Sequence, residues 1–152
     1  MKKHILKILT LFAIAISLIG CESTKTGKLN EPLTIDDVTV TVTKYEFAIV
    51  DDTNWVTLRA NFENNSKNSI IVWWTAKLIY ADGYEYSGEM TIPSCLSEHG
   101  DLVWASFNLE PLNTMSSHLF GFKNVPDSLR TDEKPLKVKM EIDGREFEID
   151  LR

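Results

Sequence analysis

The chain has 152 residues, of which 16 are Lys or Arg and 22 are Asp or Glu, so its formal net charge is −6. This length fits one ordinary domain, which can bury roughly two thirds of its unfolded surface without disulfides. The acidic balance argues against a nucleic-acid partner and against adhesion to anionic lipid through surface charge alone. With 43% hydrophobic and 10% aromatic residues, the composition also excludes a disordered chain.

Residues 1–20 are predicted to be an export signal peptide. A basic start, with Lys2, Lys3 and Lys7, precedes an apolar run from Ile8 to Ile19. That run is shorter than the roughly 20 residues that span a bilayer, so a permanent transmembrane helix is disfavoured. Removing the signal and its three lysines leaves 132 residues with 13 basic against 22 acidic side chains, a net charge of −9.

The end of the signal, Leu18-Ile19-Gly20-Cys21, resembles the lipobox of bacterial lipoproteins. This resemblance implies that the Cys21 thiol carries diacylglycerol and becomes the first residue after cleavage. Two or more acyl chains would hold the domain on the membrane, outside the cytoplasm. Glu22 is not the Asp that retains enteric lipoproteins in the inner membrane, so the outer membrane is expected if the cell has one. An ordinary secretory signal with a nearby cysteine is the alternative.

Residues 21–32 are predicted to be a lipid-anchored, flexible polar tether. The segment from Glu22 to Asn30 is small and polar, and Leu29 is its one large apolar residue. About ten such residues have an r.m.s. reach of roughly 17 Å. The folded domain is therefore expected to begin at residue 33 and to float just above the membrane.

Residues 33–152 show the two-residue period of strands. Val38, Val40 and Val42 share one face, whereas Tyr45 and Phe47 continue the apolar set on the other parity. This slip near residues 43–44 predicts a bulge or a strand that changes sheets. Residues 51–54 are expected to turn the chain into a second strand, 56–62, which ends at the polar turn 64–68.

Residues 70–80 alternate over eleven positions and are predicted to form one central core strand, followed by a hairpin turn at Asp82-Gly83. Further strands are expected at 103–109 and 119–123, and a polar loop at 127–135. The last hairpin turns at Asp143-Gly144, and its outward Lys and Glu residues are expected to blunt edge-to-edge pairing. Eight or so short strands predict an all-β, immunoglobulin-like two-layer β-sandwich, with a small β-barrel as the alternative.

Four segments carry a resemblance to a known family: Val56–Ser66, Asp82-Gly83, Leu109-Glu110-Pro111 and Phe120–Pro126. Together with the lipobox, they resemble the bacterial immunoglobulin-like lipoproteins of the DUF4352 type, over about residues 33–126. That family is related in fold to a secreted mycobacterial antigen family. Its members usually have Gly directly after this Pro, whereas Leu112 follows Pro111 here. The resemblance implies an envelope-facing fold and transfers no catalytic residue.

Candidate catalytic and metal residues are few. Cys95 and His99 lie four residues apart, with Asp101 and His118 also available, but their spacing matches no metal site or catalytic motif. No disulfide is expected, because lipidation of Cys21 leaves Cys95 alone. Acidic residues at 36–37, 51–52, 82 and 101 lack the interleaved spacing of a calcium loop. No catalytic residue, metal or cofactor is predicted.

Three tryptophans are the candidate binding residues. Trp55, Trp73 and Trp104 are off the parity of the main apolar faces, so they either fill the edges of the core or, with Tyr84 and Tyr86, form an exposed patch. The sequence predicts a non-catalytic interaction module whose partner is an envelope protein or glycan. A carbohydrate or peptidoglycan binder and a small hydrolase without a recognisable motif are the alternatives. The oligomeric state stays open.

Overall fold

The computed structural model describes residues 25–72, 76–80, 83–87, 91–92, 103–104 and 107–152. The predicted signal peptide and Cys21 lie outside these ranges. The described part is almost entirely strand, with one helical turn, α2 (Ser128–Thr131).

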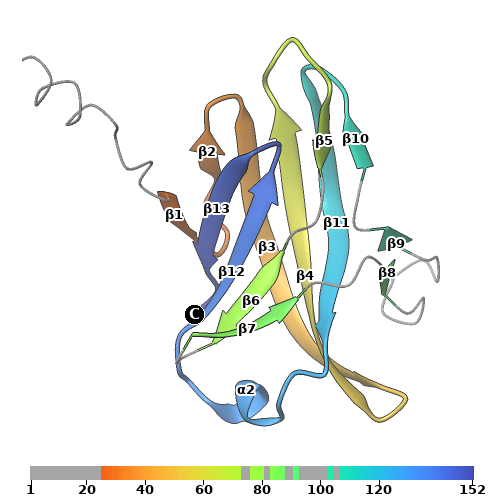
Figure 1. The fold of residues 1–152 in the computed structure, drawn as a ribbon, viewed down its shortest axis with the longest axis vertical. Helices are drawn as coiled ribbons and strands as arrows, with labels where there is room; N and C mark the ends of the chain where they lie inside the picture. The colour runs from red at the N-terminus through yellow and green to blue at the C-terminus, as the bar shows by residue number, and fades with distance from the viewer. Residues whose placement is uncertain (1–24, 73–75, 81–82, 88–90, 93–102, 105–106) are drawn as a thin grey trace, which may run out of the picture.

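Two open sheets make up the body of the domain (Figure 1). The five-stranded sheet has the order β1-β13-β12-β6-β7 and the four-stranded sheet has the order β11-β4-β3-β2. The five-stranded sheet comprises β1 (Lys25–Lys28), β6 (Lys77–Tyr80), β7 (Tyr84–Ser87), β12 (Leu136–Ile142) and β13 (Arg145–Asp150). The four-stranded sheet comprises β2 (Leu33–Ile35), β3 (Val38–Val50), β4 (Thr53–Asn64) and β11 (Asn113–Lys123). Two short ribbons pair β5 (Ile70–Val72) with β10 (Phe107–Leu109) and β8 (Thr91–Ile92) with β9 (Val103–Trp104).

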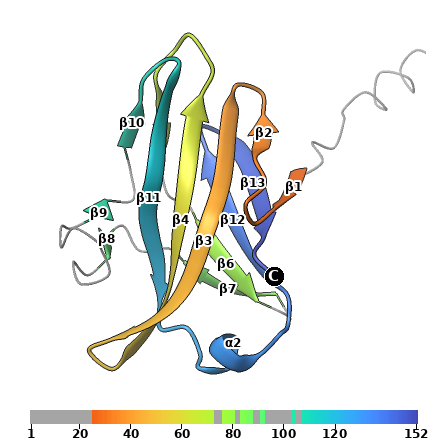
Figure 2. The same ribbon diagram turned by 180° about the vertical axis from the view of Figure 1, so that it is seen from behind.

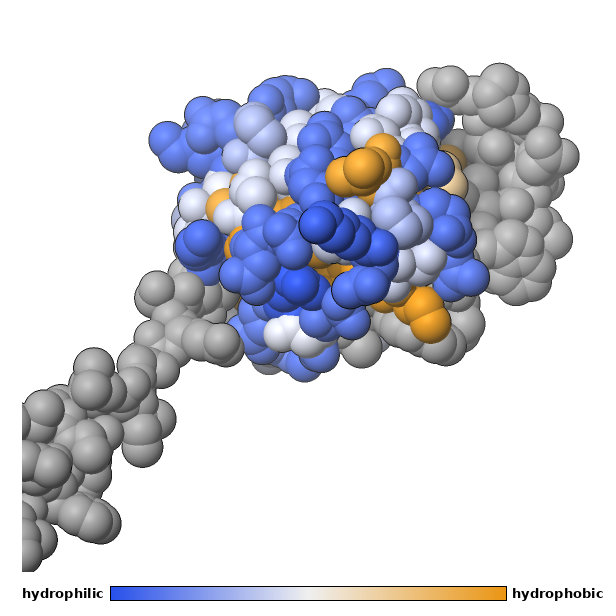
Figure 3. Space-filling model, turned by 90° about the horizontal axis from the view of Figure 1, so that it is seen from above, coloured by the Kyte–Doolittle hydropathy of each residue, from blue (hydrophilic) through white to orange (hydrophobic). Residues whose placement is uncertain are grey.

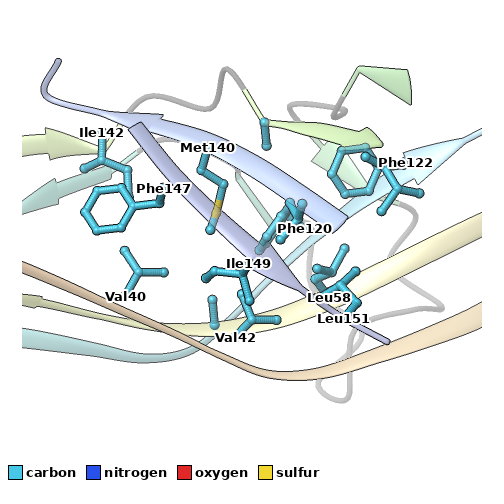
Figure 4. Close-up of a cluster of buried hydrophobic side chains, with 14 of the residues drawn as sticks. Val40, Val42, Leu58, Phe120, Phe122, Met140, Ile142, Phe147, Ile149 and Leu151 are labelled. Atoms are coloured by element: carbon cyan, nitrogen blue, oxygen red, sulfur yellow. The ribbon is translucent and has the colours of Figure 1, made fainter. Parts of the chain in front are cut away.

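The hydrophobic core lies between the two sheets. Figure 4 shows Val40, Val42 and Leu58 from one layer facing side chains of the other layer. The opposing residues, all buried, include Met140, Ile142, Phe147, Ile149 and Leu151. The predicted two-layer β-sandwich is confirmed, and the barrel alternative is not, because both sheets have free edges in the described part of the chain.

The predicted bulge in the first long strand is confirmed. The register between β3 and β4 shifts between Val42 and Lys44, so that Val42 pairs with Ala60 and Tyr45 pairs with Leu58. One extra residue therefore keeps both halves of the apolar set facing the core. At the turn, Asp51 and Asp52 have φ angles of 47° and 58°, as a two-residue type I′ hairpin requires.

The predicted single strand over residues 70–80 is wrong. Its first part is β5, which pairs with β10, whereas its last part is β6, which pairs with β12 and β7. Ile70, Val72, Ala76 and Leu78 are nevertheless all buried. Residues 103–109 likewise contain two strands, β9 and β10. Alternation shows which side chains face the core, but a chain that changes sheets in a sandwich keeps facing the same core.

The last hairpin forms as predicted, with Asp143 and Gly144 at φ angles of 50° and 75°. The expectation that it protects a sheet edge is wrong, because β13 is covered by β1 on its outer side. Its outward charges instead pair across the strands. The Lys137 ammonium lies 2.8 Å from the Glu148 carboxylate, and the Lys139 ammonium lies 3.0 Å from that of Glu146.

The N-terminal segment is more ordered than the predicted tether of residues 21–32. Lys25–Lys28 form β1, which runs parallel to β13, and the Leu29 amide donates to the Asp150 carbonyl at 2.9 Å. Leu29 also packs against the core. A Cβ added at Gly27 would lie 3.1 Å from Cβ of Leu33, so the small residue permits this close approach. The sequence did not predict β1, because strand pairing through backbone groups alone leaves no hydrophobic alternation in a short polar segment.

Candidate functional site

The N-terminal edge of the sandwich, defined as β1, β2 and the turn 29–32, joins the two sheets. β1 is the outermost strand of one sheet and β2 that of the other. The Asn30 amide donates to the Val42 carbonyl at 2.8 Å, and Lys25 Nζ donates to the Thr34 carbonyl at 3.4 Å. In Figure 2 this edge lies on the opposite side of the molecule from β8, β9 and β10. The first described residue is thus fixed to both layers.

Trp55 is the candidate binding residue whose side chain the structure describes, and it is 7% exposed. It forms a small cluster with Leu119, against which Ala48 and Val50 pack. Lys123 of β11 pairs with Trp55 in the register, and Leu119 lies four residues earlier on the same face of β11. Trp55 therefore fills the outer side of the four-stranded sheet and is not available to stack on a sugar ring.

The described structure does not bring the other candidate residues together in one site. Trp73, Asp82, Cys95, His99 and Asp101 lie outside the described residues, and Trp104 is described only as backbone in β9. The exposed Tyr84 and the half-buried Tyr86 lie on β7.

His118 lies inside an aromatic cluster. Its ring centroid is 4.6 Å from that of Phe107 and 6.2 Å from that of Phe62. This environment is that of a residue packed at the margin of the core.

Two of the predicted acidic pairs lie at opposite ends of β3, since Asp36-Asp37 precede it and Asp51-Asp52 follow it. The two pairs therefore do not form one acidic site, and the Asp36 carboxylate lies 3.4 Å from Nε of Arg145. Among the residues that the structure describes, no group of three or more His, Cys, Asp or Glu side chains could hold a metal ion.

A hollow of about 160 Å³ lies on the outer face of the five-stranded sheet. Its walls are charged: Lys77 Nζ contacts Glu85 at 2.6 Å, and Lys139 contacts Glu146, which raises the pKa of Lys139. Small-molecule sites are mostly apolar and have about 300–1,000 Å³. This hollow is smaller, and its two lysines are each already paired with a glutamate.

A second crevice, of about 10 Å³, lies where the β3–β4 hairpin meets the segment before α2. Asn54 Nδ2 donates to the Asp127 carboxylate at 3.0 Å, and the Val125 amide lies 3.4 Å from the Asn54 carbonyl. Phe47 and Trp55 also line this crevice. It has space for about one water molecule, so it is a packing seam and not a ligand site.

Two polar arrangements were missed by sequence reasoning. Asn64 is 1% exposed, and its Nδ2 donates to the carbonyls of Asn68, Leu109 and Glu110 at 2.8, 3.0 and 3.2 Å. Its Oδ1 accepts from the Ser66 amide at 2.9 Å. The sequence predicted this residue to be the first of the turn 64–68, whereas it is the last residue of β4, and its role as the buried link between the turn and β10 was missed.

The second arrangement joins β6 to the segment after α2. The Tyr80 hydroxyl donates to the Asp132 carboxylate at 2.6 Å, and Lys134 Nζ lies 3.2 Å from the same oxygen. The hydrogen bond from Tyr80 lowers the pKa of Asp132, and the same bond, with burial, raises the pKa of Tyr80. Because both residues are already satisfied by each other, this is a structural contact.

Similar solved structures share the fold. A β-sandwich protein of Clostridium difficile has 18% sequence identity and a TM-score of 0.59, over 88% of this chain and 99% of that chain. A secreted protein of Mycobacterium tuberculosis has 15% identity and a TM-score of 0.54, over 86% of this chain and 98% of that one. The expected fold relation to a secreted mycobacterial protein is thereby found. A protein of Bacillus subtilis described as a putative lipoprotein has 13% identity and a TM-score of 0.55, over 78% of this chain and 38% of that one.

No protein-family model matches the sequence, and no curated protein is significantly similar to it. Membership of the DUF4352 type therefore stays a prediction. In the described residues, no helix has the length and apolar character needed to cross a membrane.

Proposed function

We propose that this chain is a lipid-anchored protein of the bacterial envelope whose sandwich acts as a non-catalytic interaction module outside the cytoplasm. The observation that carries the proposal is the position of Cys21. It closes a lipobox-like sequence and stands four residues before β1, the first strand that the structure describes. Acyl chains on this cysteine would hold the whole domain at a membrane, since each buried CH₂ contributes about 0.8 kcal/mol.

The similar solved structures support the envelope location without establishing it. One is described as a putative lipoprotein and another as a secreted protein. The described hollows support an interaction module over an enzyme, because the larger is smaller than usual small-molecule sites and has a charged lining, and the smaller has space for about one water. Recognition by such a domain would use its strand edges and turns.

The anchor is tested by replacing Cys21 with Ala in the native host. The wild-type protein should incorporate labelled palmitate and sediment with membranes, whereas Cys21→Ala should do neither. Cys95→Ala is the matched control, because it removes the other cysteine of the chain and should leave labelling and sedimentation unchanged. Membrane retention of Cys21→Ala, or an unmodified amino terminus in the native protein, would contradict the proposal.

The interaction role is tested by cross-linking on intact cells. A photoreactive residue at Tyr84, which is 70% exposed on β7, should capture an envelope protein or glycan. A probe at the buried Val138 of β12 is the matched control and should capture nothing. Equal capture at the two positions would show non-specific reaction and count against a defined partner.

A further inference from the structure

The length of chain between the proposed anchor and the folded body is short. Residues 22–24 alone separate Cys21 from Lys25, the first residue of β1. Four Cα–Cα steps reach at most roughly 14 Å, since an extended chain advances about 3.5 Å per residue. This distance is smaller than the roughly 17 Å expected for a flexible tether of about ten residues, because β1 has taken residues 25–28 into the sheet.

The folded end of this short linker, β1, is fixed to both sheets by backbone hydrogen bonds. β1 pairs with β13 along four residues, and the Leu29 and Asn30 amides that follow it donate to carbonyls of β13 and β3. The anchor point therefore cannot slide along the domain surface. It is fixed at the N-terminal edge, where β1 and β2 close one side of the sandwich (Figures 1 and 2).

The opposite side of the five-stranded sheet is distant from this edge. Four strand spacings separate β1 from β7, and at about 4.8 Å each they amount to roughly 19 Å. If β7 touched the membrane with the sheet upright, β1 would lie about 19 Å above it. The linker from Cys21 to β1 reaches only about 14 Å, so this arrangement is excluded. Two arrangements remain that place both strands near the bilayer: the five-stranded sheet lies flat on it, or the sandwich stands on one of its ends.

The charge on the outer face of the five-stranded sheet does not favour laying this face flat on the membrane. The outer side of the five-stranded sheet carries carboxylates of Glu85, Glu141, Glu146, Glu148 and Asp150 against the lysines of β6, β12 and β1. Lys77 on β6 and Lys137 and Lys139 on β12 are already paired with carboxylates. An anionic bilayer surface would gain nothing from such a face.

The end of the sandwich that carries the β2–β3 and β12–β13 turns offers no apolar contact of useful size either. Seen from above, this end is mainly hydrophilic, and hydrophobic atoms form only separate spots (Figure 3). It also exposes Asp36, Asp37, Glu110 and Asp143. By contrast, β1 exposes Lys25 and Lys28, the two basic residues nearest to Cys21 in a domain of net negative charge.

We infer that the N-terminal edge, formed by β1 and the turn to β2, is the surface that faces the bilayer carrying the lipid anchor. The edge formed by β7 and β11 then points away from the membrane, toward partners in the envelope. This orientation rests on the proposed anchor at Cys21, since it follows from the length of the leash that begins there. The short linker sets this orientation. Lys25 and Lys28, against the one exposed acid Glu31 of the turn, leave β1 and the turn with a net charge of +1, which favours it on an anionic surface.

The test compares fluorescent labels at two matched positions of the lipidated protein. Thr26 on β1 and Ser87 on β7 are both exposed hydroxyl residues on the outermost strands of the same sheet. Thr26→Cys and Ser87→Cys are made separately in a Cys95→Ser background, in which acylation protects Cys21 from the label. Each protein is placed in vesicles of phosphatidylethanolamine and phosphatidylglycerol that contain a lipid with a spin-labelled headgroup.

We expect the label at Thr26→Cys to be quenched at least threefold more than the label at Ser87→Cys. Equal quenching, or stronger quenching at Ser87→Cys, in protein that sediments with the vesicles would overturn the orientation while leaving the anchor intact. Protein that fails to bind vesicles, with Cys21 open to the label, would overturn the anchor itself. The two failures are therefore distinguishable.

A longer leash provides the second measurement. Inserting fifteen Gly and Ser residues after Glu22 raises the r.m.s. reach to roughly 24 Å, which exceeds the width between β1 and β7. The difference between the two labels should then shrink by more than half. An unchanged difference would contradict the role of the short leash.

Discussion

The two ends of the sandwich are closed by different kinds of contact. At the upper end in Figure 1, the buried amide of Asn64 joins the turn after β4 to the end of β10. At the lower end, the buried side chains of Val125 and Leu129 cover the core, and polar contacts such as Tyr80 to Asp132 lie near the surface. A hydrogen bond contributes more when its loss leaves buried groups unpaired, whereas near the surface water replaces the partner. The comparison therefore predicts a ranking of substitutions.

The largest effect is expected at the lower end, from Leu129→Ala. Leu129 is fully buried in the single helical turn, and its truncation leaves a cavity beneath α2. We expect the free energy of unfolding to fall by about 3 kcal/mol, as for other buried Leu→Ala changes. Chemical denaturation followed by tryptophan fluorescence measures it. Arg130→Ala, exposed on the same turn, is the control, and an equal loss in both variants would show that α2 matters through its backbone and not through Leu129.

At the upper end, Asn64→Ala is expected to cost about 2 kcal/mol, because the buried carbonyl of Leu109 and the part-buried carbonyls of Asn68 and Glu110 lose their donor. The neighbouring Asn65 is exposed, and its side chain makes one long contact with Thr39 at 3.5 Å. Asn65→Ala should therefore cost less than 0.5 kcal/mol, as surface changes usually do. The same denaturation experiment compares them. If Asn65→Ala cost as much as Asn64→Ala, the upper end would not be closed by the buried amide.

A smaller effect is expected on the outer face between the two ends. Lys137 lies 2.8 Å from Glu148 and 3.5 Å from Asp150, and these carboxylates, Glu148 first, raise the pKa of Lys137. Its side chain is more than a third exposed, so Lys137→Gln should cost about 0.5 kcal/mol in low salt and less in 1 M salt. Lys44→Gln, whose partner Glu46 is more exposed, should cost less. A cost for Lys137→Gln that does not change with salt would exclude an electrostatic origin.

The smallest effect is expected for Tyr80→Phe, and it should depend on pH. The folded pKa of Asp132 is lowered, so the contact stabilises the fold above the unfolded value of about 3.9 and is lost as pH falls through the folded pKa. The folded pKa of Tyr80 is raised, so the contact is fully present below about 10 and is lost as pH rises through the folded value.

The difference in melting temperature between wild type and Tyr80→Phe should therefore be flat from about pH 5 to 9 and shrink on both sides. Tyr84→Phe, which changes an exposed hydroxyl on β7, is the control and should show no such window. A difference that grows below pH 4 would mean that Tyr80 does not act through the Asp132 carboxylate.

Parts of the fold also differ in how well they could be predicted from the sequence. The β12–β13 hairpin was predicted well, because its turn residues and its strict alternation are local signals. The division of residues 70–80 into β5 and β6 was missed, because inward-facing positions look the same whichever sheet holds them. The parallel pairing of β1 with β13 was missed for a related reason: it depends on backbone groups from opposite ends of the chain, and β1 has no apolar pattern of its own.

The candidate site shows the same limit. The off-parity position of Trp55 was read correctly from the sequence, but whether an outward tryptophan is exposed depends on its neighbours across the strand. Its partner Leu119 comes from β11, which is more than sixty residues away in the sequence. Single-strand patterns do not contain that information, and the same holds for the partners of Asn64 on β10.

If the chain is exported and anchored as proposed, the parallel pairing of β1 with β13 has a consequence for the order in which it folds. β1, the strand nearest to Cys21, has no sheet to join until residues 147–150, more than a hundred residues later in the chain, have been translocated. Closing a loop of more than a hundred residues is entropically costly and slow compared with forming hairpins. A nascent domain would thus remain on a longer leash while the rest of the sandwich assembles. The final docking of β1 would draw it in toward the bilayer.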